Sequence, residues 1–292
     1  MNVYIQSVLL GIVEGLTEFL PVSSTAHLRI TEALMRIPMD DAYWKMYTIV
    51  IQAGAILALL LLYLGRIVGF LRTFPEGENG NRNWLTHPIS LTLIAFAFTS
   101  APALLLKKWS DKNLGSISVM ALALLIGGIV MWIVDVWFSR LEATTTHVEE
   151  MSLGQSIWIG LCQALSAIFP GVSRSMSTIA AGQIANLDRP SALEFSFLLS
   201  IPTMLSATGY DLLKEIHPVK MAAGTAAAAH VTMDPERWIV LFIGFIVSFI
   251  VALGVVEWFL LWVRRHGFAI FAIYRIVLGI FLLAFGSHLL GS

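Results

Sequence analysis

Charged residues are scarce in this 292-residue chain. Asp, Glu, Lys and Arg make up 13% of it and hydrophobic residues 57%, whereas an average soluble protein has roughly 25% charged residues. This composition excludes an ordinary soluble domain and indicates an integral membrane protein. The net charge is −1, and no block of basic residues interrupts the apolar sequence, so nucleic acid is not expected as a partner.

Cysteine is almost absent. The single residue of this type, Cys162, excludes an intramolecular disulfide and a cysteine-rich metal site. A basic leader is also missing from the first apolar run, residues 3–20, which contains Glu14 and Glu18. We therefore expect this run to be retained structure rather than a cleaved signal peptide.

Apolar windows of about 20 residues, long enough to cross a ~30 Å hydrocarbon layer as helices, occur six times. They lie near residues 43–64, 89–106, 116–138, 192–212, 238–263 and 268–289. The sequence thus predicts an all-α integral membrane protein with about six transmembrane helices. Lys and Arg divide almost evenly between the two predicted sides, so the charge distribution does not set the orientation.

Two further apolar segments, residues 3–36 and 153–187, are interrupted by Pro21 and by Pro170-Gly171. Proline removes a backbone donor and disfavours helix in the residue before it. Irregular backbone at membrane depth is tolerated only where it is buried in protein or lines a wet cavity. Each segment is therefore predicted to be a re-entrant helix-turn-helix hairpin, and each break marks a candidate site.

The hairpins and spans form two halves of a single membrane domain, residues 1–292. The first half, 1–150, contains hairpin 3–36 and three spans; the second, 151–292, contains hairpin 153–187 and three spans. Three spans is an odd number, so the second half is predicted to be inverted relative to the first. Inverted repeats with broken helices carry their polar sites at the repeat interface, so the two hairpins should meet tip to tip. The Ala-rich stretch 220–230 is expected to be a surface excursion.

Two carboxylates lie in the first hairpin. Glu14 and Glu18 are four residues apart, which places them on one helical face about one turn apart. Their repulsion in an apolar surrounding requires a proton, a neighbouring arginine or a divalent ion such as Mg²⁺ or Ca²⁺ held through oxygens. The alternative is a charged helix face that lines an aqueous vestibule without chemistry.

A hydroxyl cluster follows the first break. Capping the returning helix accounts for one of Ser23, Ser24 and Thr25, but not for all three. Free N–H groups at a helix start suit an anion, and phosphate is the natural candidate. His27 lies close enough to act as a general base or to accept a proton, although a lone membrane histidine is otherwise a packed polar group.

The second hairpin carries Arg174. Its planar fork, with hydroxyls on both sides, fits bidentate recognition of phosphate oxygens, and a glycine allows close backbone approach. The neighbours expected to bind substrate with it are Gly171, Ser173, Ser175 and Thr178. The structural alternative pairs Arg174 with a glutamate of the first hairpin, and the two interpretations are compatible.

Other polar groups lie within or at the edge of the predicted spans. Helix–helix hydrogen bonds and ion pairs are their commonest explanation. Gln52 and Gln163 are expected to support the site, and the structural group comprises Asp135, Glu194, Glu257 and Arg275.

Residues 14–25 with His27, and residues 170–175, resemble the two motifs of the undecaprenyl-diphosphate phosphatase family, also known as the bacitracin resistance protein family; residues 52–56 are similar to a third stretch. The resemblance covers essentially the whole chain. It implies a bacterial inner-membrane enzyme that removes the terminal phosphate of the C55 lipid diphosphate and so recycles the carrier for cell-wall polymers. It also implies dependence on Mg²⁺ or Ca²⁺ and an active site that faces the periplasm. Ala26 and Met176 depart from the family, which has glycine at both positions.

The combined hypothesis assigns Glu14, Glu18, Ser24, His27 and Arg174 to catalysis, with Glu14 and Glu18 holding the ion. The substrate-binding group is Ser23, Thr25, Gly171, Ser173, Ser175 and Thr178. The nucleophile is either Ser24 activated by His27 or a metal-activated water. A lipid-phosphate flippase or transporter is the alternative function. The oligomeric state stays open, with a homodimer among the possibilities.

Overall fold

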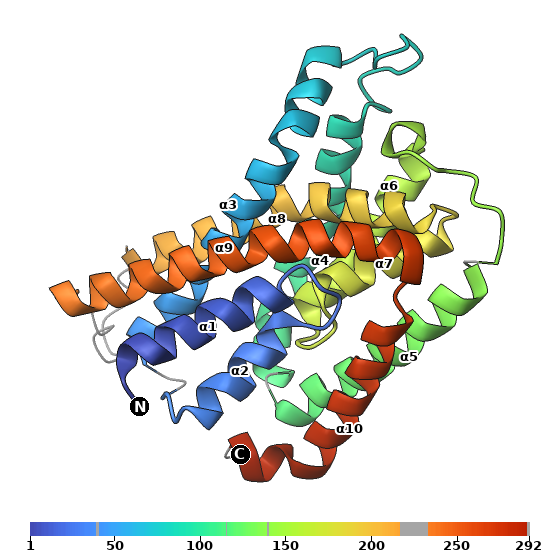
Figure 1. Ribbon diagram of the computed structural model, residues 1–292. Helices are drawn as coiled ribbons and strands as arrows, with labels where there is room; N and C mark the ends of the chain where they lie inside the picture. Colours follow the sequence, from blue (N-terminus) through green and yellow to red (C-terminus); the bar gives the residue numbers. More distant parts are fainter. Residues whose placement is uncertain (39–40, 115, 139, 217–232, 291–292) are drawn as a thin grey trace.

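The protein is all-helical in the computed structural model, which describes residues 1–38, 41–114, 116–138, 140–216 and 233–290 (Figure 1). These residues form ten α-helices and one three-residue 3₁₀ helix, Val148–Glu150, and no β-strand. The predicted surface excursion at 220–230 lies outside them. The prediction of an all-α fold is confirmed.

Six of the helices are long. They are α3 (Ala42–Thr73), α4 (Pro88–Asn113), α5 (Ile117–Phe138), α8 (Arg189–Ile216), α9 (Pro235–His266) and α10 (Ala269–Leu290). By length and composition, five of the described helices can cross a membrane, and α8 is not among them. The sequence predicted about six. Charged and hydroxyl residues, among them Glu194, Ser196 and Ser200, interrupt the apolar sequence of α8.

Four shorter helices form two consecutive pairs. Helix α1 (Val3–Thr17) is followed by α2 (Ser24–Leu34), and α6 (Leu153–Ile168) by α7 (Arg174–Ile184). Each pair is interrupted where the sequence has its proline. The N-caps Ser23 and Ser173 adopt φ values of 75° and 71°, a left-handed conformation that is uncommon outside glycine. The two breaks therefore share a backbone geometry that neither regular helix nor an ordinary turn supplies.

Helices before and after residue 150 make matching contacts. Helix α1 packs on α9 as α6 packs on α4, α2 contacts α10 as α7 contacts α5, and α5 and α10 pack on each other (Figure 1). Ser7 Oγ donates to the Val240 carbonyl at 2.6 Å, and Ser156 Oγ donates to the Leu91 carbonyl at the same distance. Ser156 lies 149 residues after Ser7, and Val240 lies 149 residues after Leu91.

The two breaks contact each other directly. Arg174 forms an ion pair with Glu18, and Ser175 Oγ donates to the Leu20 carbonyl at 2.9 Å. Phe19, which is 1% exposed, packs its ring edge-on against Phe197 with the centroids 5.7 Å apart. This buried aromatic contact anchors the first break next to Glu18. The expected meeting of the two tips is thus observed.

Gly160 lets α6 approach α4. A Cβ at this position would collide with the carbonyl oxygen of Ala95 and lie 2.9 Å from its Cα, whereas a Cβ at Gly154 on the same helix would meet nothing within 4 Å. Overpacking typically costs about 1–3 kcal/mol. Gly160→Ala should therefore lower the unfolding temperature in detergent clearly, and Gly154→Ala should leave it unchanged or raise it. Equal melting temperatures for the two variants would contradict this packing.

Candidate active site

A cavity of about 250 Å³ lies between the two breaks. The first break contributes Glu18, Ser23, Ser24 and Thr25, and the second contributes Pro170, Gly171, Ser173 and Arg174. The rest of the wall comes from α3, α4, α6 and α8, with the polar residues Gln52, Thr99, Gln163, Ser166, Thr203 and Thr208. The wall therefore combines polar side chains with apolar ones such as Ala167, Met204 and Ala207, and its two charged residues, Glu18 and Arg174, lie at the breaks.

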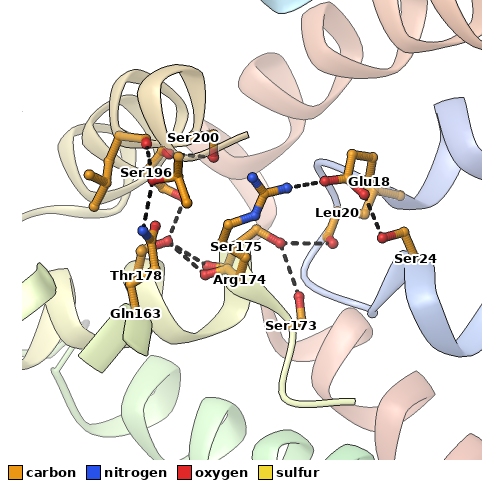
Figure 2. A network of polar contacts seen from close by, with 12 residues as sticks. Glu18, Leu20, Ser24, Gln163, Ser173, Arg174, Ser175, Thr178, Ser196 and Ser200 are labelled. Carbon is orange, nitrogen blue, oxygen red and sulfur yellow. Dashed lines mark hydrogen bonds and ion pairs between the residues drawn. The ribbon is translucent and has the colours of Figure 1, made fainter. Parts of the chain in front are cut away.

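Glu18 connects the two breaks through both of its carboxylate oxygens. Oε1 pairs with the Arg174 guanidinium, and Oε2 accepts a hydrogen bond of 2.5 Å from Ser24 Oγ (Figure 2). The side chain of Glu18 is 4% exposed and that of Arg174 is 19% exposed. The structural alternative for Arg174 is thus realised, while its guanidinium still lines the cavity.

Glu14 lies one helical turn before Glu18 and is fully buried. No hydrogen-bond donor in the described chain reaches either of its carboxylate oxygens, and its neighbour is the carboxylate of Glu18. A buried carboxylate without a donor is costly unless a proton or a cation accompanies it. The donor set, two carboxylates one turn apart, fits a hard divalent cation.

His27 makes contacts other than the expected one. Its Nδ1 lies 2.8 Å from the Ser23 carbonyl, and its Nε2 lies 2.6 Å from Tyr274 Oη, with the two rings stacked at 5.6 Å. A carbonyl only accepts, so Nδ1 carries a proton, and in a neutral ring Nε2 accepts from the phenol. The Ser24 hydroxyl meets Glu18 and not His27. Tyr274 carries no signal in the sequence that would have linked it to His27.

The predicted substrate-binding residues separate into two groups. Ser23, Thr25, Gly171 and Ser173 line the cavity, whereas Ser175 and Thr178 do not.

Ser175 and Thr178 stabilise the second break through contacts outside the cavity. The Ser175 hydroxyl donates to the Leu20 carbonyl. The Thr178 hydroxyl donates to the Arg174 carbonyl at 3.0 Å, and its oxygen lies 2.6 Å from Ser196 Oγ. Figure 2 shows these two residues in the network around Arg174. Their hydroxyls fix the backbone that carries the guanidinium.

The two departures from the family motifs lie outside the cavity wall. Ala26 is fully buried against α5 and α10 residues. Met176 lies in the first turn of α7 and lines an apolar groove of about 510 Å³ between α5 and the α6–α7 pair. A Cβ at Gly127 would lie 2.7 Å from Met176 Cε, so that glycine makes room for the longer side chain.

Arg275 on α10 joins the two breaks from inside the protein. It is 0% exposed, and its guanidinium donates to the carbonyls of Pro21 at 3.2 Å, Gly171 at 3.0 Å and Val172 at 2.9 Å. Among the described residues, its hydrogen-bond partners are backbone carbonyls and no carboxylate. The sequence indicated a structural residue, and a lone arginine in an apolar helix was the signal available. Its position between the tips required the structure.

The sequence model of the family described as "Bacitracin resistance protein BacA" matches residues 7–281. The chain is 59% identical over 284 residues to the "Undecaprenyl-diphosphatase" of Koribacter versatilis (strain Ellin345), an alignment that covers 97% of this chain and 98% of the relative. Relatives with the same name in Wolinella succinogenes and Rhizobium etli are 42% and 40% identical. Those alignments cover 95% and 97% of this chain and 96% and 97% of the relatives, respectively.

Replacing Arg275 by methionine should destabilise the protein, because three turn carbonyls lose a charged donor in a buried position. Hydrogen bonds to charged groups contribute about 1.5–3 kcal/mol each, so Arg275→Met should lower the unfolding free energy by at least about 3 kcal/mol. Thermal unfolding in detergent measures the effect, with the exposed Arg140→Met as the control. Equal melting temperatures for the two variants would show that the carbonyl contacts do not hold the breaks.

Proposed function

The chain belongs to the bacitracin resistance protein BacA family, and from this membership and the site geometry we propose that it is an undecaprenyl-diphosphatase. It would hydrolyse undecaprenyl diphosphate to undecaprenyl phosphate and inorganic phosphate and so recycle the lipid carrier for cell-wall synthesis. The observation that carries the proposal is the Arg174–Glu18–Ser24 chain, which places an anion-binding fork, a carboxylate and a hydroxyl on one cavity.

Binding begins at Arg174. Its guanidinium presents a planar fork that suits two phosphate oxygens, and the helices α2 and α7 begin at the cavity with free N–H groups that favour an anion. Ser23 and Ser173 are their N-caps. A diphosphate that pairs with Arg174 takes the place of Glu18 Oε1 and leaves that carboxylate free to act on Ser24.

The attacking group in this proposal is Ser24 Oγ. It forms a bond to the terminal phosphorus while the bond from phosphorus to the bridging oxygen breaks and the lipid monophosphate leaves. The hydroxyl proton goes to Glu18, its hydrogen-bond acceptor. Water then hydrolyses the phosphoserine and releases phosphate. The proton that Glu18 took up must leave to restore the carboxylate, and His27 Nε2, which accepts from the Tyr274 hydroxyl, is the base proposed to receive it. Direct attack by water is the alternative.

Glu14 and Glu18 are the residues that would hold a divalent cation, Mg²⁺ or Ca²⁺, which when bound would offset the negative charge of the diphosphate. The buried, donor-free oxygens of Glu14 support this assignment. The described part of the chain has no group of three or more His, Cys, Asp and Glu side chains that could hold a metal ion. A cation here would therefore depend on substrate oxygens and water to complete its ligands.

We further infer that the two broken helix pairs are re-entrant hairpins of an inverted repeat. Helix α1 has 15 residues and α6 has 16, which is about 22–24 Å at 1.5 Å per residue and shorter than a ~30 Å membrane core. The matching contacts of α1 with α9 and of α6 with α4 support the repeat. The site would face the periplasm from the inner membrane of a bacterium.

A lipid-phosphate flippase or transporter is the second candidate, favoured by the paired broken helices on either side of a polar cavity. Binding alone does not need a hydroxyl that donates to a buried carboxylate, so hydrolysis accounts for more of the site. Phosphate release by the purified protein decides between them.

Loss of the central residues should abolish turnover. Arg174→Ala and Glu18→Gln are expected to reduce phosphate release from undecaprenyl diphosphate by about 10²- to 10³-fold, the scale of removing one group that stabilises transition-state charge. His27→Ala is also expected to lose most of the activity. The exposed Arg72→Ala serves as the control for Arg174→Ala. Near-normal rates in all three site variants would refute the site.

A phosphoserine distinguishes the two attack mechanisms. Acid quenching during turnover should trap labelled phosphate on a peptide that contains Ser24, and Ser24→Ala should abolish both the label and the activity. Full activity in Ser24→Ala would select direct attack by water.

The cation is tested by chelation. EDTA should stop phosphate release by the wild-type protein, and Mg²⁺ or Ca²⁺ should restore it. Glu14→Gln should raise the half-saturating cation concentration about tenfold or more, since one of two carboxylate ligands is neutralised. Equilibrium dialysis with labelled Ca²⁺ measures binding without turnover. Unchanged Ca²⁺ binding in Glu14→Gln would remove Glu14 from the site.

A further inference from the structure

Gln163 lies in the cavity wall with an acceptor that has no partner. The side chain, on α6, is 0% exposed, yet it lines the cavity between the breaks. Its Oε1 has no hydrogen-bond partner in the described chain, whereas its Nε2 has two. In Figure 2 it lies on the opposite side of Arg174 from Glu18 and Ser24.

The orientation of this amide is determined by two threonines. Nε2 donates to Thr99 Oγ1 at 3.1 Å and to Thr203 Oγ1 at 3.0 Å. The Thr203 hydroxyl donates its proton to the Leu199 carbonyl, and the Thr99 hydroxyl donates to the carbonyls of Ala95 and Gly160. Both threonine oxygens can therefore only accept from Gln163. Turning the amide over would set its oxygen against two acceptors, so Oε1 keeps its position.

The place of Gln163 in the chain matches that of Glu14. It lies seven residues before Pro170, as Glu14 lies seven residues before Pro21. Both side chains are fully buried, and both keep acceptor oxygens without partners. Glu14 is a carboxylate and suits a cation or a proton. Gln163 is neutral, and its oxygen suits a group that brings an O–H donor without adding charge.

We propose that Gln163 Oε1 accepts a hydrogen bond from an O–H group bound in the cavity. This assignment rests on the proposed phosphatase function. Two O–H groups of that reaction have the required chemistry: the water that attacks phosphorus and a protonated phosphate oxygen of the substrate. A glutamine that orients an attacking water is a known device in phosphoryl transfer. In the hydrolysis step, the water oxygen bonds to phosphorus, the bond from phosphorus to Ser24 Oγ breaks, and one water proton passes to that oxygen.

Gln163→Met tests the assignment, because methionine has a similar length and no acceptor. If the donor is the attacking water, kcat for phosphate release should fall about 10- to 100-fold while KM changes little. If the donor is a protonated phosphate oxygen, KM should rise instead, and mainly below about pH 6, where phosphate holds its last proton. Steady-state kinetics with undecaprenyl diphosphate between pH 5 and 8 separate the two sources.

Gln183→Met is the matched control. Gln183 is also buried with an unpaired Oε1, but it bonds to Asp135 and does not line the cavity. The Gln183→Met variant should retain wild-type kcat and KM. Thr203→Val removes one of the two threonine oxygens that accept from the Gln163 amide. It should change kcat or KM, whichever Gln163→Met changes, in the same direction by about 3- to 10-fold.

Wild-type kcat and KM in Gln163→Met at every pH, or equal losses in Gln163→Met and Gln183→Met, would overturn the assignment. If Gln163→Met does not fold, wild-type kcat and KM in Thr203→Val would overturn the assignment. Absence of phosphate release by the wild-type protein would instead contradict the proposed phosphatase function itself.

Discussion

The ion pair between Arg174 and Glu18 is the interaction on which the rest of the structure depends. Each residue stands at a break in a helix, the two breaks are 156 residues apart in sequence, and both side chains are largely withdrawn from solvent. Either charge alone would be expensive in such a place. The surrounding contacts act together to keep the pair aligned: Phe19 packs beside Glu18, Ser175 ties the second break to Leu20, and Arg275 holds the carbonyls of both turns.

Most polar groups around this pair are satisfied by the protein, and the exceptions are informative. Glu14 and Gln163 occupy equivalent places before the two prolines, and each keeps acceptor oxygens without a donor in the described residues. The two hairpins share a backbone plan, while their side chains have diverged toward different partners. One carries carboxylates and the other an arginine and a neutral amide, and the proposed phosphate site draws on both.

Much of this arrangement could be predicted from the sequence, because proline, hydroxyl clusters and charges stand out against an apolar background. The two broken helix pairs, five of the six spans and the contact between the tips follow from that pattern. Helix α8 differs from the prediction, since by length and composition it is not among the helices that can cross a membrane, and polar residues such as Glu194 interrupt its apolar sequence. The partners of His27 and Arg275 could not be predicted, because they depend on how helices separated by more than 100 residues are rotated against each other.

A double-mutant cycle measures whether residues from the two hairpins act as one site. Phosphate release would be compared for the wild type, Arg174→Ala, Glu18→Gln and the double variant. Residues that act as a unit are strongly non-additive. The double variant should therefore be about as slow as the slower single variant. Multiplicative losses would show that Arg174 and Glu18 act independently and not as one site.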